Sequence, residues 1–152
     1  MFHGFIGEYH HSIDAKNRVM VPAKFRDAFA ETQQEPRFYL TRGPDHCLMM
    51  FTPEQWEHLE KTLDAVTDVK NLKGSVRHFH RAIYTNAHYC ACDKLGRIVI
   101  PQTLVDHAGL RKEVVIAGVK HRMEIWSEEK WKEYQDKILE DFENLTEDIY
   151  QT

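Results

Sequence analysis

Residues 14–22 read Asp-Ala-Lys-Asn-Arg-Val-Met-Val-Pro, and residues 93–101 read Asp-Lys-Leu-Gly-Arg-Ile-Val-Ile-Pro. Both stretches have an Asp, three residues, an Arg, three aliphatic residues and a Pro, at a constant offset of 79 residues. A second matched pair follows in the same order, because residues 48–56 resemble residues 123–131 at an offset of 75. Two matched blocks in one order indicate an internal duplication.

Each copy begins with the pattern of a strand, a tight turn and a second strand. Residues 5–13 mix apolar and polar positions up to the first Asp, and residues 18–21 form an aliphatic strand after the turn. Asn17 and its counterpart Gly96 are the residue types that best tolerate a left-handed backbone. We therefore expect the same turn geometry in both copies.

A short helix and a hairpin are predicted next in each copy. Pro22 and Pro101 suit the first position of a helix, where a missing N–H costs nothing. The apolar residues of these helices are Phe25, Ala28 and Phe29 in the first copy and Leu104, Val105 and Ala108 in the second. Turn signals at 42–45 and 118–121 then predict two hairpins, with strands at 38–41 and 47–51 and at 113–117 and 122–126.

Longer helices are predicted after the hairpins. Thr52, Pro53 and Gln55 have the spacing of a helix start with a capping box, and Ser127 begins the equivalent helix. A connecting amphipathic helix is predicted between the copies. Its apolar stripe is Leu72, Val76, Phe79 and Ile83, and its basic stripe is Lys70, Lys73, Arg77 and Arg81, with His78 and His80 nearby.

The charge of the chain is distributed unevenly. The 152 residues are 42% hydrophobic, enough for a core, and 20 basic against 24 acidic residues give a net charge of -4. Residues 127–152 hold three Lys and nine acids, or -6, so residues 1–126 carry -4 - (-6) = +2. The total therefore argues against a generic basic coat for nucleic acid, and the acidity belongs to the C-terminal segment.

The sequence lacks the features of membrane and secreted proteins. No stretch approaches the roughly 20 apolar residues of a membrane span, and residues 1–4 do not begin a signal peptide. The three cysteines, Cys47, Cys90 and Cys92, are too few for a disulfide framework. We expect a cytoplasmic protein with reduced thiols and no membrane partner.

With these motifs in view, the chain resembles the bacterial MraZ family. The resemblance is carried by residues 7–18 and 21–26 in the first copy and by 93–101, 107–110 and 124–126 in the second. It spans nearly the whole chain, in two correctly ordered copies. One departure is Asn17, where the family usually has Gly.

The resemblance implies a fold and a role. The implied fold is α+β, mainly β, with two AbrB-like swapped-hairpin βαβ halves that form a pseudo-dimeric β-barrel with flanking helices. The implied role is a nucleoid-associated transcriptional regulator. Such a protein assembles into a homo-oligomeric ring and binds short direct repeats of double-stranded DNA in the promoter of the division and cell-wall gene cluster. The corresponding boundaries are 7–55 for the first SpoVT-AbrB-like repeat, 56–86 for a helical connection, 87–130 for the second repeat and 131–152 for an acidic C-terminal helix.

The two Asp-x-x-x-Arg turns are the candidate DNA-binding loops. Asp14 and Asp93 can pair with the Arg across the turn and organise the loop, and an Arg held in this way can meet a phosphate or a guanine edge. The alternative is an ion pair that only fastens the turn. The predicted DNA-binding residues are Lys16, Asn17, Arg18, Lys94 and Arg97. The resemblance favours the first loop more than the second, because two equivalent loops on a barrel need not face one partner.

Other features have simpler explanations than a second site. The basic stripe of the connecting helix is interpreted as a solvated face or a subunit contact. His88, Cys90 and Cys92 alternate along one strand, but no fourth zinc ligand completes them, so buried thiols are favoured. Residues 11–14, His-Ser-Ile-Asp, alternate faces and do not make a triad. We therefore expect no enzyme, no catalytic residue, no metal and no cofactor. The alternative function is an antitoxin-like or scaffolding module that docks a protein on its acidic C-terminal helix.

Overall fold

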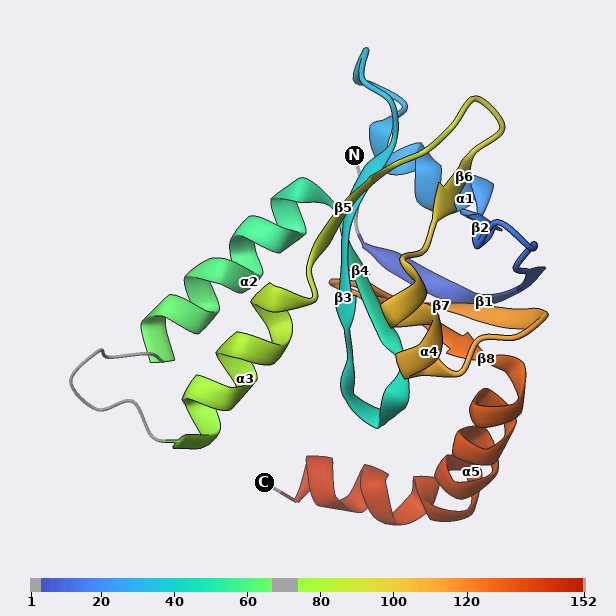
Figure 1. Ribbon diagram of the computed structural model, residues 1–152. Coiled ribbons are helices and arrows are strands. Elements are labelled where there is room, and N and C mark those ends of the chain that lie inside the picture. The colour runs from blue at the N-terminus through green and yellow to red at the C-terminus, as the bar shows by residue number, and fades with distance from the viewer. Residues whose placement is uncertain (1–3, 67–73, 152) are drawn as a thin grey trace.

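A six-stranded antiparallel sheet forms the centre of the molecule (Figure 1). The computed structural model describes residues 4–66 and 74–151. The sheet has the order β1-β7-β8-β4-β3-β5, and β2 and β6 form a separate two-stranded ribbon. The strands are β1 Phe5–Ser12, β2 Arg18–Met20, β3 Arg37–Arg42, β4 Leu48–Phe51, β5 His88–Ala91, β6 Arg97–Val99, β7 Glu113–Lys120 and β8 Met123–Ser127. The predicted α+β class and both predicted hairpins are confirmed.

The two sequence copies share this sheet by pairing across the repeat. β1 of the first copy pairs with β7 of the second, with Tyr9 opposite Ile116. β5 of the second copy pairs with β3 of the first, with Phe38 opposite Cys90. The two hairpins join through β4 and β8, and β2 pairs with β6. Neither copy could therefore satisfy its strand hydrogen bonds alone.

The β-barrel that the resemblance implies is not closed in the described part of the chain. In the described part of the chain, β1 and β5 form the two edges of the sheet and do not pair with each other. β2 follows β1 and β6 follows β5, but these three-residue strands pair with each other and not with the sheet strands. A single bridge, from Ile13 to Val19, links the described ribbon to an extension of β1. The ribbon thus lies across the open side of the sheet without closing it.

The main core lies between the sheet and the ribbon. Val19 and Ile98 point inward from the ribbon, and Phe25 packs edge to face on Phe5 with ring centroids 4.9 Å apart. Burying a large apolar side chain contributes roughly 1.5–3 kcal/mol, so this core fastens the ribbon to the sheet. Its fully buried large side chains include Phe38, Leu40, Leu48, Met50, Ile100, Leu104, Ile116, Met123 and Ile125.

Short helices follow the two prolines, as predicted. α1 spans Ala23–Arg26 and continues in the 3₁₀ turn Asp27–Phe29, whereas α4 spans Gln102–Ala108. A second 3₁₀ turn, Pro44–His46, lies in the loop of the β3–β4 hairpin.

Helices α2 (Pro53–Val66) and α3 (Gly74–Thr85) lie side by side on one flank of the molecule (Figure 1). The predicted capping box is present, because Gln55 N–H donates to Thr52 Oγ1 and Thr52 N–H donates to Gln55 Oε1, both at 3.1 Å. In the predicted connecting helix, Ile83 is buried but Phe79 is half exposed. Lys70, Leu72 and Lys73 lie outside the described residues.

The last helix, α5 (Glu128–Tyr150), starts at the predicted cap, where Ser127 Oγ accepts from Lys130 N–H at 3.1 Å. Its first turns place Trp131 and Tyr134 on a small cluster of Cys47, Val115 and Trp126 on the outer face of the sheet. The remaining turns extend below the β3–β4 hairpin (Figure 1). Nowhere in residues 4–66 or 74–151 is a helix long and apolar enough to cross a bilayer.

Candidate nucleic-acid interface

The first Asp-x-x-x-Arg loop, residues 14–18, is held by its aspartate. Asp14 Oδ1 accepts from the backbone N–H groups of Lys16 at 2.9 Å and Arg18 at 2.8 Å, and Oδ2 accepts from Arg18 Nε at 2.6 Å. The hydrogen bond from the Arg18 backbone N–H and the guanidinium beside it hold the pKa of Asp14 below its usual value. The carboxylate thus organises the turn and orients the Arg18 side chain.

The second loop, residues 93–97, repeats this geometry. Asp93 Oδ1 accepts from the backbone N–H groups of Leu95 at 3.0 Å and Arg97 at 2.9 Å, and Oδ2 accepts from Arg97 Nε at 2.8 Å. The pKa of Asp93 is lowered for the same reason, with the Arg97 backbone hydrogen bond as the largest cause. The predicted pairing of Asp and Arg across the turn is therefore confirmed in both copies.

Each loop is also fastened by the other copy. Asn17 and Gly96 both have a positive φ, 59° and 87°. This conformation turns their carbonyl groups toward the opposite strand, where Ile100 N–H donates to Asn17 O at 2.8 Å and Val21 N–H donates to Gly96 O at 3.0 Å. The two loops are thus locked into one unit by reciprocal backbone hydrogen bonds.

The ribbon brings the two predicted arginines onto one surface. In the register of β2 and β6, Arg18 is opposite Val99 and Met20 is opposite Arg97. Residues directly opposite share a face, and side chains alternate along a strand, so both arginines point outward while Val19 and Ile98 point into the core. The arginines are diagonal neighbours, a relation that places Cα atoms about 7–8 Å apart. The two loops therefore face the same side.

The lysines of the loops add unmatched positive charge. Lys16 and Lys94 are exposed, and within the described ranges neither forms an ion pair. Residues 14–20 and 93–99 together hold four basic and two acidic side chains, so the ribbon and its loops carry a net charge of +2. This surface is positive although the whole chain is negative.

Two residues beside the loops were not predicted from the sequence. Arg26 of α1 donates from Nε to Val21 O at 3.1 Å, and its guanidinium lies against Gly96. Gln102, the first residue of α4, accepts from Asn17 Nδ2 at 3.0 Å. The sequence indicates only that Arg26 and Gln102 lie in the helices that follow the two prolines. Their contacts with the other copy became visible only in the tertiary structure.

The cysteines do not offer nucleophilic chemistry. Burial raises the pKa of Cys47 to about 12 and the pKa values of Cys90 and Cys92 to about 11. All three side chains are buried, as interpreted from the sequence for Cys90 and Cys92. Among the residues that the structure describes, no group of three His, Cys, Asp or Glu side chains could hold a metal ion.

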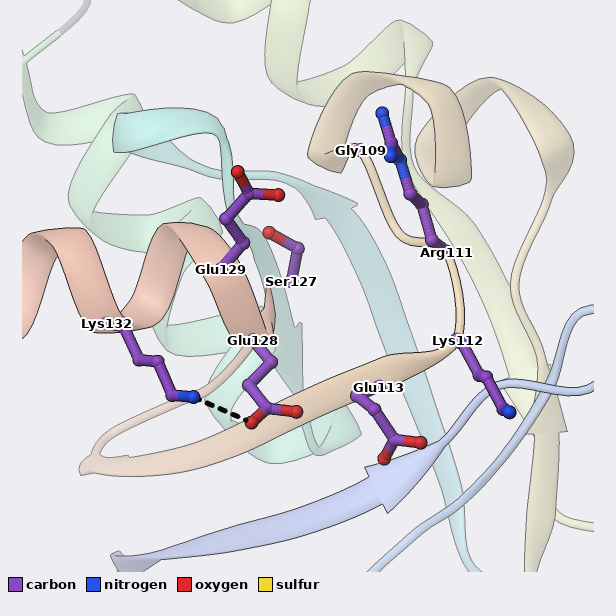
Figure 2. A pocket seen from close by; sticks show the side chains of 8 residues that line it. All are labelled: Gly109, Arg111, Lys112, Glu113, Ser127, Glu128, Glu129 and Lys132. Carbon is purple, nitrogen blue, oxygen red and sulfur yellow. Dashed lines mark ion pairs between the residues drawn. The ribbon is translucent and has the colours of Figure 1, made fainter.

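A pocket of about 370 Å³ lies where α5 begins, beside the chain that enters β7 (Figure 2). Its charges are balanced, because the acidic Glu113, Glu128 and Glu129 are matched by Arg111, Lys112 and Lys132. Lys132 pairs with Glu128 at 3.3 Å, and the Ser127 hydroxyl is engaged in capping α5. This pocket has no positioned nucleophile and base, and it favours no class of ligand.

Comparison with known proteins gives the family. The family model described as "MraZ protein, putative antitoxin-like" matches residues 4–73 and 83–151. A protein of Natranaerobius thermophilus is 42% identical over 145 residues, which cover 95% of this chain and 96% of that protein. A Ligilactobacillus salivarius protein is 43% identical with the same coverage, and a Clostridium tetani protein is 41% identical over 94% of each chain. Each of the three is named "Transcriptional regulator MraZ". This chain therefore belongs to the MraZ family.

Proposed function

We propose that this protein is a sequence-specific DNA-binding transcriptional regulator. Its ribbon, formed by β2 and β6, inserts into a groove of the DNA. The observation that carries the proposal is that Arg18 and Arg97 share the outward face of the ribbon, each oriented by an aspartate. The names of the relatives, all transcriptional regulators, support the same role. We infer that the protein is not an enzyme.

The architecture and the side chains of the ribbon suit the major groove. That groove is about 12 Å wide and admits a two-stranded β-ribbon. Arg18 and Arg97 have the guanidinium geometry for bidentate contact with guanine O6 and N7, while Lys16 and Lys94 can meet phosphates on either side. Asn17 has amide groups that could pair with adenine, so it belongs to the proposed binding set.

A net charge of +2 on one ribbon predicts weak binding by a single chain. We infer, from the family resemblance, that chains assemble into a ring and bind direct repeats in the promoter of the division and cell-wall genes. Further contacts from one ring are intramolecular, and they can raise avidity by roughly 10²–10⁴. The crossed strand pairing supports the inference that residues 7–55 and 87–130 are AbrB-like halves with exchanged hairpins.

The test is a gel-shift titration on the DNA upstream of its own gene with Arg18→Ala and Arg97→Ala. Loss of one bidentate contact is expected to weaken binding by about 1–3 kcal/mol, or roughly five- to 150-fold. Arg111→Ala is the matched control, because it removes an equal charge at the pocket beside β7. Equal affinity for Arg18→Ala and wild type would exclude the first loop as a reader of sequence, and the same result for Arg97→Ala would exclude the second.

The alternative from another class is an antitoxin-like or scaffolding module. The exposed apolar side chains of α5 and the description of the family model favour it. It predicts a stable protein partner in a pull-down and no salt-sensitive affinity for DNA.

A further inference from the structure

The final turns of α5 expose several large apolar side chains. We call residues 138–150 the distal segment. Leu139 is 70% exposed, Phe142 56% and Tyr150 85%, in contrast to the partly buried Trp131 and Tyr134 nearer the sheet. A cluster of exposed large apolar residues on one element is a feature of interaction surfaces.

The charge of the distal segment restricts its partner. It contains five acids, Glu140, Asp141, Glu143, Glu147 and Asp148, and no Lys or Arg. Two such segments placed side by side would repel each other, since like charges at helical spacing or across an interface are unfavourable. The complementary surface must be basic and partly apolar.

The ribbon has this composition. Leu95 is 63% exposed and Val99 57%, and they lie among Lys16, Lys94 and the two arginines. Another exposed aromatic near basic residues is Phe79 on α3, but the neighbouring α2 carries Glu57, Glu60 and Asp64, which reduce the positive field there. Charge and apolar area together favour the ribbon.

The distal segment cannot reach the ribbon of its own chain. Figure 1 shows it below the β3–β4 hairpin, whereas β2 and β6 lie on the opposite side of the molecule. The contact must therefore be made with a second copy. It joins two different surfaces, so it is a head-to-tail contact.

We propose that the distal segment of one chain docks on the β2–β6 ribbon of a second copy, and that it competes there with DNA. The contact itself rests on charge and apolar area, whereas the competition rests on the proposed function. The acids occupy the place of phosphates, and the apolar side chains cover Leu95 and Val99. An assembly joined in this way has lower affinity for DNA until DNA displaces the segment.

The contact is tested by cross-linking between chains. Full-length Glu143→Cys chains are mixed with Leu95→Cys chains and treated with a short bismaleimide, and the heterodimer is measured on a denaturing gel. The native thiols react slowly, because burial raises their pKa values to about 11–12. Val66→Cys replaces Leu95→Cys as the control, because Val66 on α2 is similarly exposed, at 66% against 63% for Leu95.

The expected heterodimer yield is several-fold higher for the 143–95 pair than for the 143–66 pair, and it falls when salt or promoter DNA is added. Equal yields for the two pairs overturn the docking. A high yield that DNA does not reduce overturns the competition. If no DNA binds at all while the 143–95 pair still forms in a salt-sensitive way, the proposed function fails and the docking stands.

A second measurement uses charge alone. The variant Glu140→Gln/Glu143→Gln/Glu147→Gln is expected to bind DNA several-fold more tightly at protein concentrations where chains associate. The variant Glu54→Gln/Glu57→Gln/Glu60→Gln removes the same charge from α2 and controls for the general field of the protein. The same gain in both variants contradicts a specific contact.

Discussion

At the scale of single residues, two different residue types adopt the same left-handed backbone conformation in the two loops. Asn17 and Gly96 occupy equivalent positions with positive φ, and each meets a side chain of the other copy in its own way. The Asn17 amide donates to Gln102, whereas the backbone of Gly96 lies directly against the Arg26 guanidinium. A Cβ at Gly96 would lie 2.7 Å from Cζ of Arg26. Gly96 is therefore required by conformation and by close packing, whereas position 17 tolerates a side chain that adopts a positive φ and reaches Gln102.

Gly96→Ala is expected to lower the free energy of unfolding by about 1–2 kcal/mol, because Ala at this φ is strained and displaces Arg26. Urea denaturation measures the change. Asn17→Gly is the matched control, because it keeps the positive φ and removes only an exposed hydrogen bond to Gln102. It is expected to change stability by roughly a few tenths of a kcal/mol. Unchanged stability in Gly96→Ala would show that the loop relaxes without cost.

His107 of α4 accepts a hydrogen bond that depends on its protonation state. Arg42 Nη2 donates to His107 Nδ1 at 2.8 Å, so the imidazole must be neutral to accept this bond. Burial, followed by the positive charge of Arg42, lowers the pKa of His107, and His46 and Lys130 act in the same direction. Protonation would therefore break the contact between β3 and α4.

This lowered pKa of His107 is expected to make the protein less stable in mild acid. The unfolded chain takes up the proton first, so the stabilisation is fully present above the usual histidine pKa, about 6.5, and is lost as the pH falls from there through the lower folded pKa. Urea denaturation between about pH 5 and 8 measures the slope. His107→Gln should reduce the slope of stability against pH only in part. His11, whose pKa is also lowered, still contributes to that slope. An unchanged slope would contradict this role for His107.

At the scale of elements, α2 depends on its first turn. The reciprocal bonds of Thr52 and Gln55 satisfy two backbone N–H groups that the helix leaves open. The helix then carries Trp56 onto a cluster with Met49, Phe51 and Ile83. The cap thus fixes the start of α2 and, with it, the position at which Trp56 packs against the sheet.

Thr52→Ala is expected to cost about 1 kcal/mol of stability, measured by thermal or urea unfolding. Thr62→Ala in the same helix is the control, because the Thr62 hydroxyl only donates to His58 O at 3.0 Å on an exposed face. A smaller loss for Thr52→Ala than for Thr62→Ala would exclude the capping contribution.

At the scale of the whole molecule, the distribution of charge matters more than the total. The ribbon and its loops carry +2, whereas residues 127–152 carry -6, and α5 extends away from the ribbon (Figure 1). The fold therefore separates an acidic helix from a basic surface. If the ribbon binds DNA as proposed, this distribution predicts few phosphate contacts per chain and a dependence on repetition in an assembly.

Lys16→Gln and Lys94→Gln should each reduce the salt dependence of DNA binding. One lost phosphate contact changes the slope of log K against log salt by about 0.9 for each binding chain. Fluorescence anisotropy titrations at several salt concentrations measure this slope. Lys112→Gln, which removes a lysine of the pocket, should leave the salt slope unchanged. An equal effect of all three variants would show that only the net charge of the protein matters, and not a contact of Lys16 or Lys94 with phosphate.

Local sequence determined the elements and the chemistry of the loops. The Asp-x-x-x-Arg pattern predicted both ion pairs because a carboxylate four residues before an Arg can satisfy the turn and the guanidinium together. Thr52 and Ser127 marked the starts of α2 and α5 because capping is a local interaction. Phe79, predicted on an apolar stripe, is half exposed, since packing against other elements decides burial.

Only the tertiary structure decided how the copies combine. The pairing of β1 with β7, of β5 with β3 and of β2 with β6 is made by residues far apart in the sequence, and no local pattern encodes it. That pairing leaves the sheet open, places Arg26 on Gly96 and Gln102 on Asn17, and turns Arg18 and Arg97 to one face. The sequence by itself determined two charged loops, and the long-range register of β2 and β6 made them one surface.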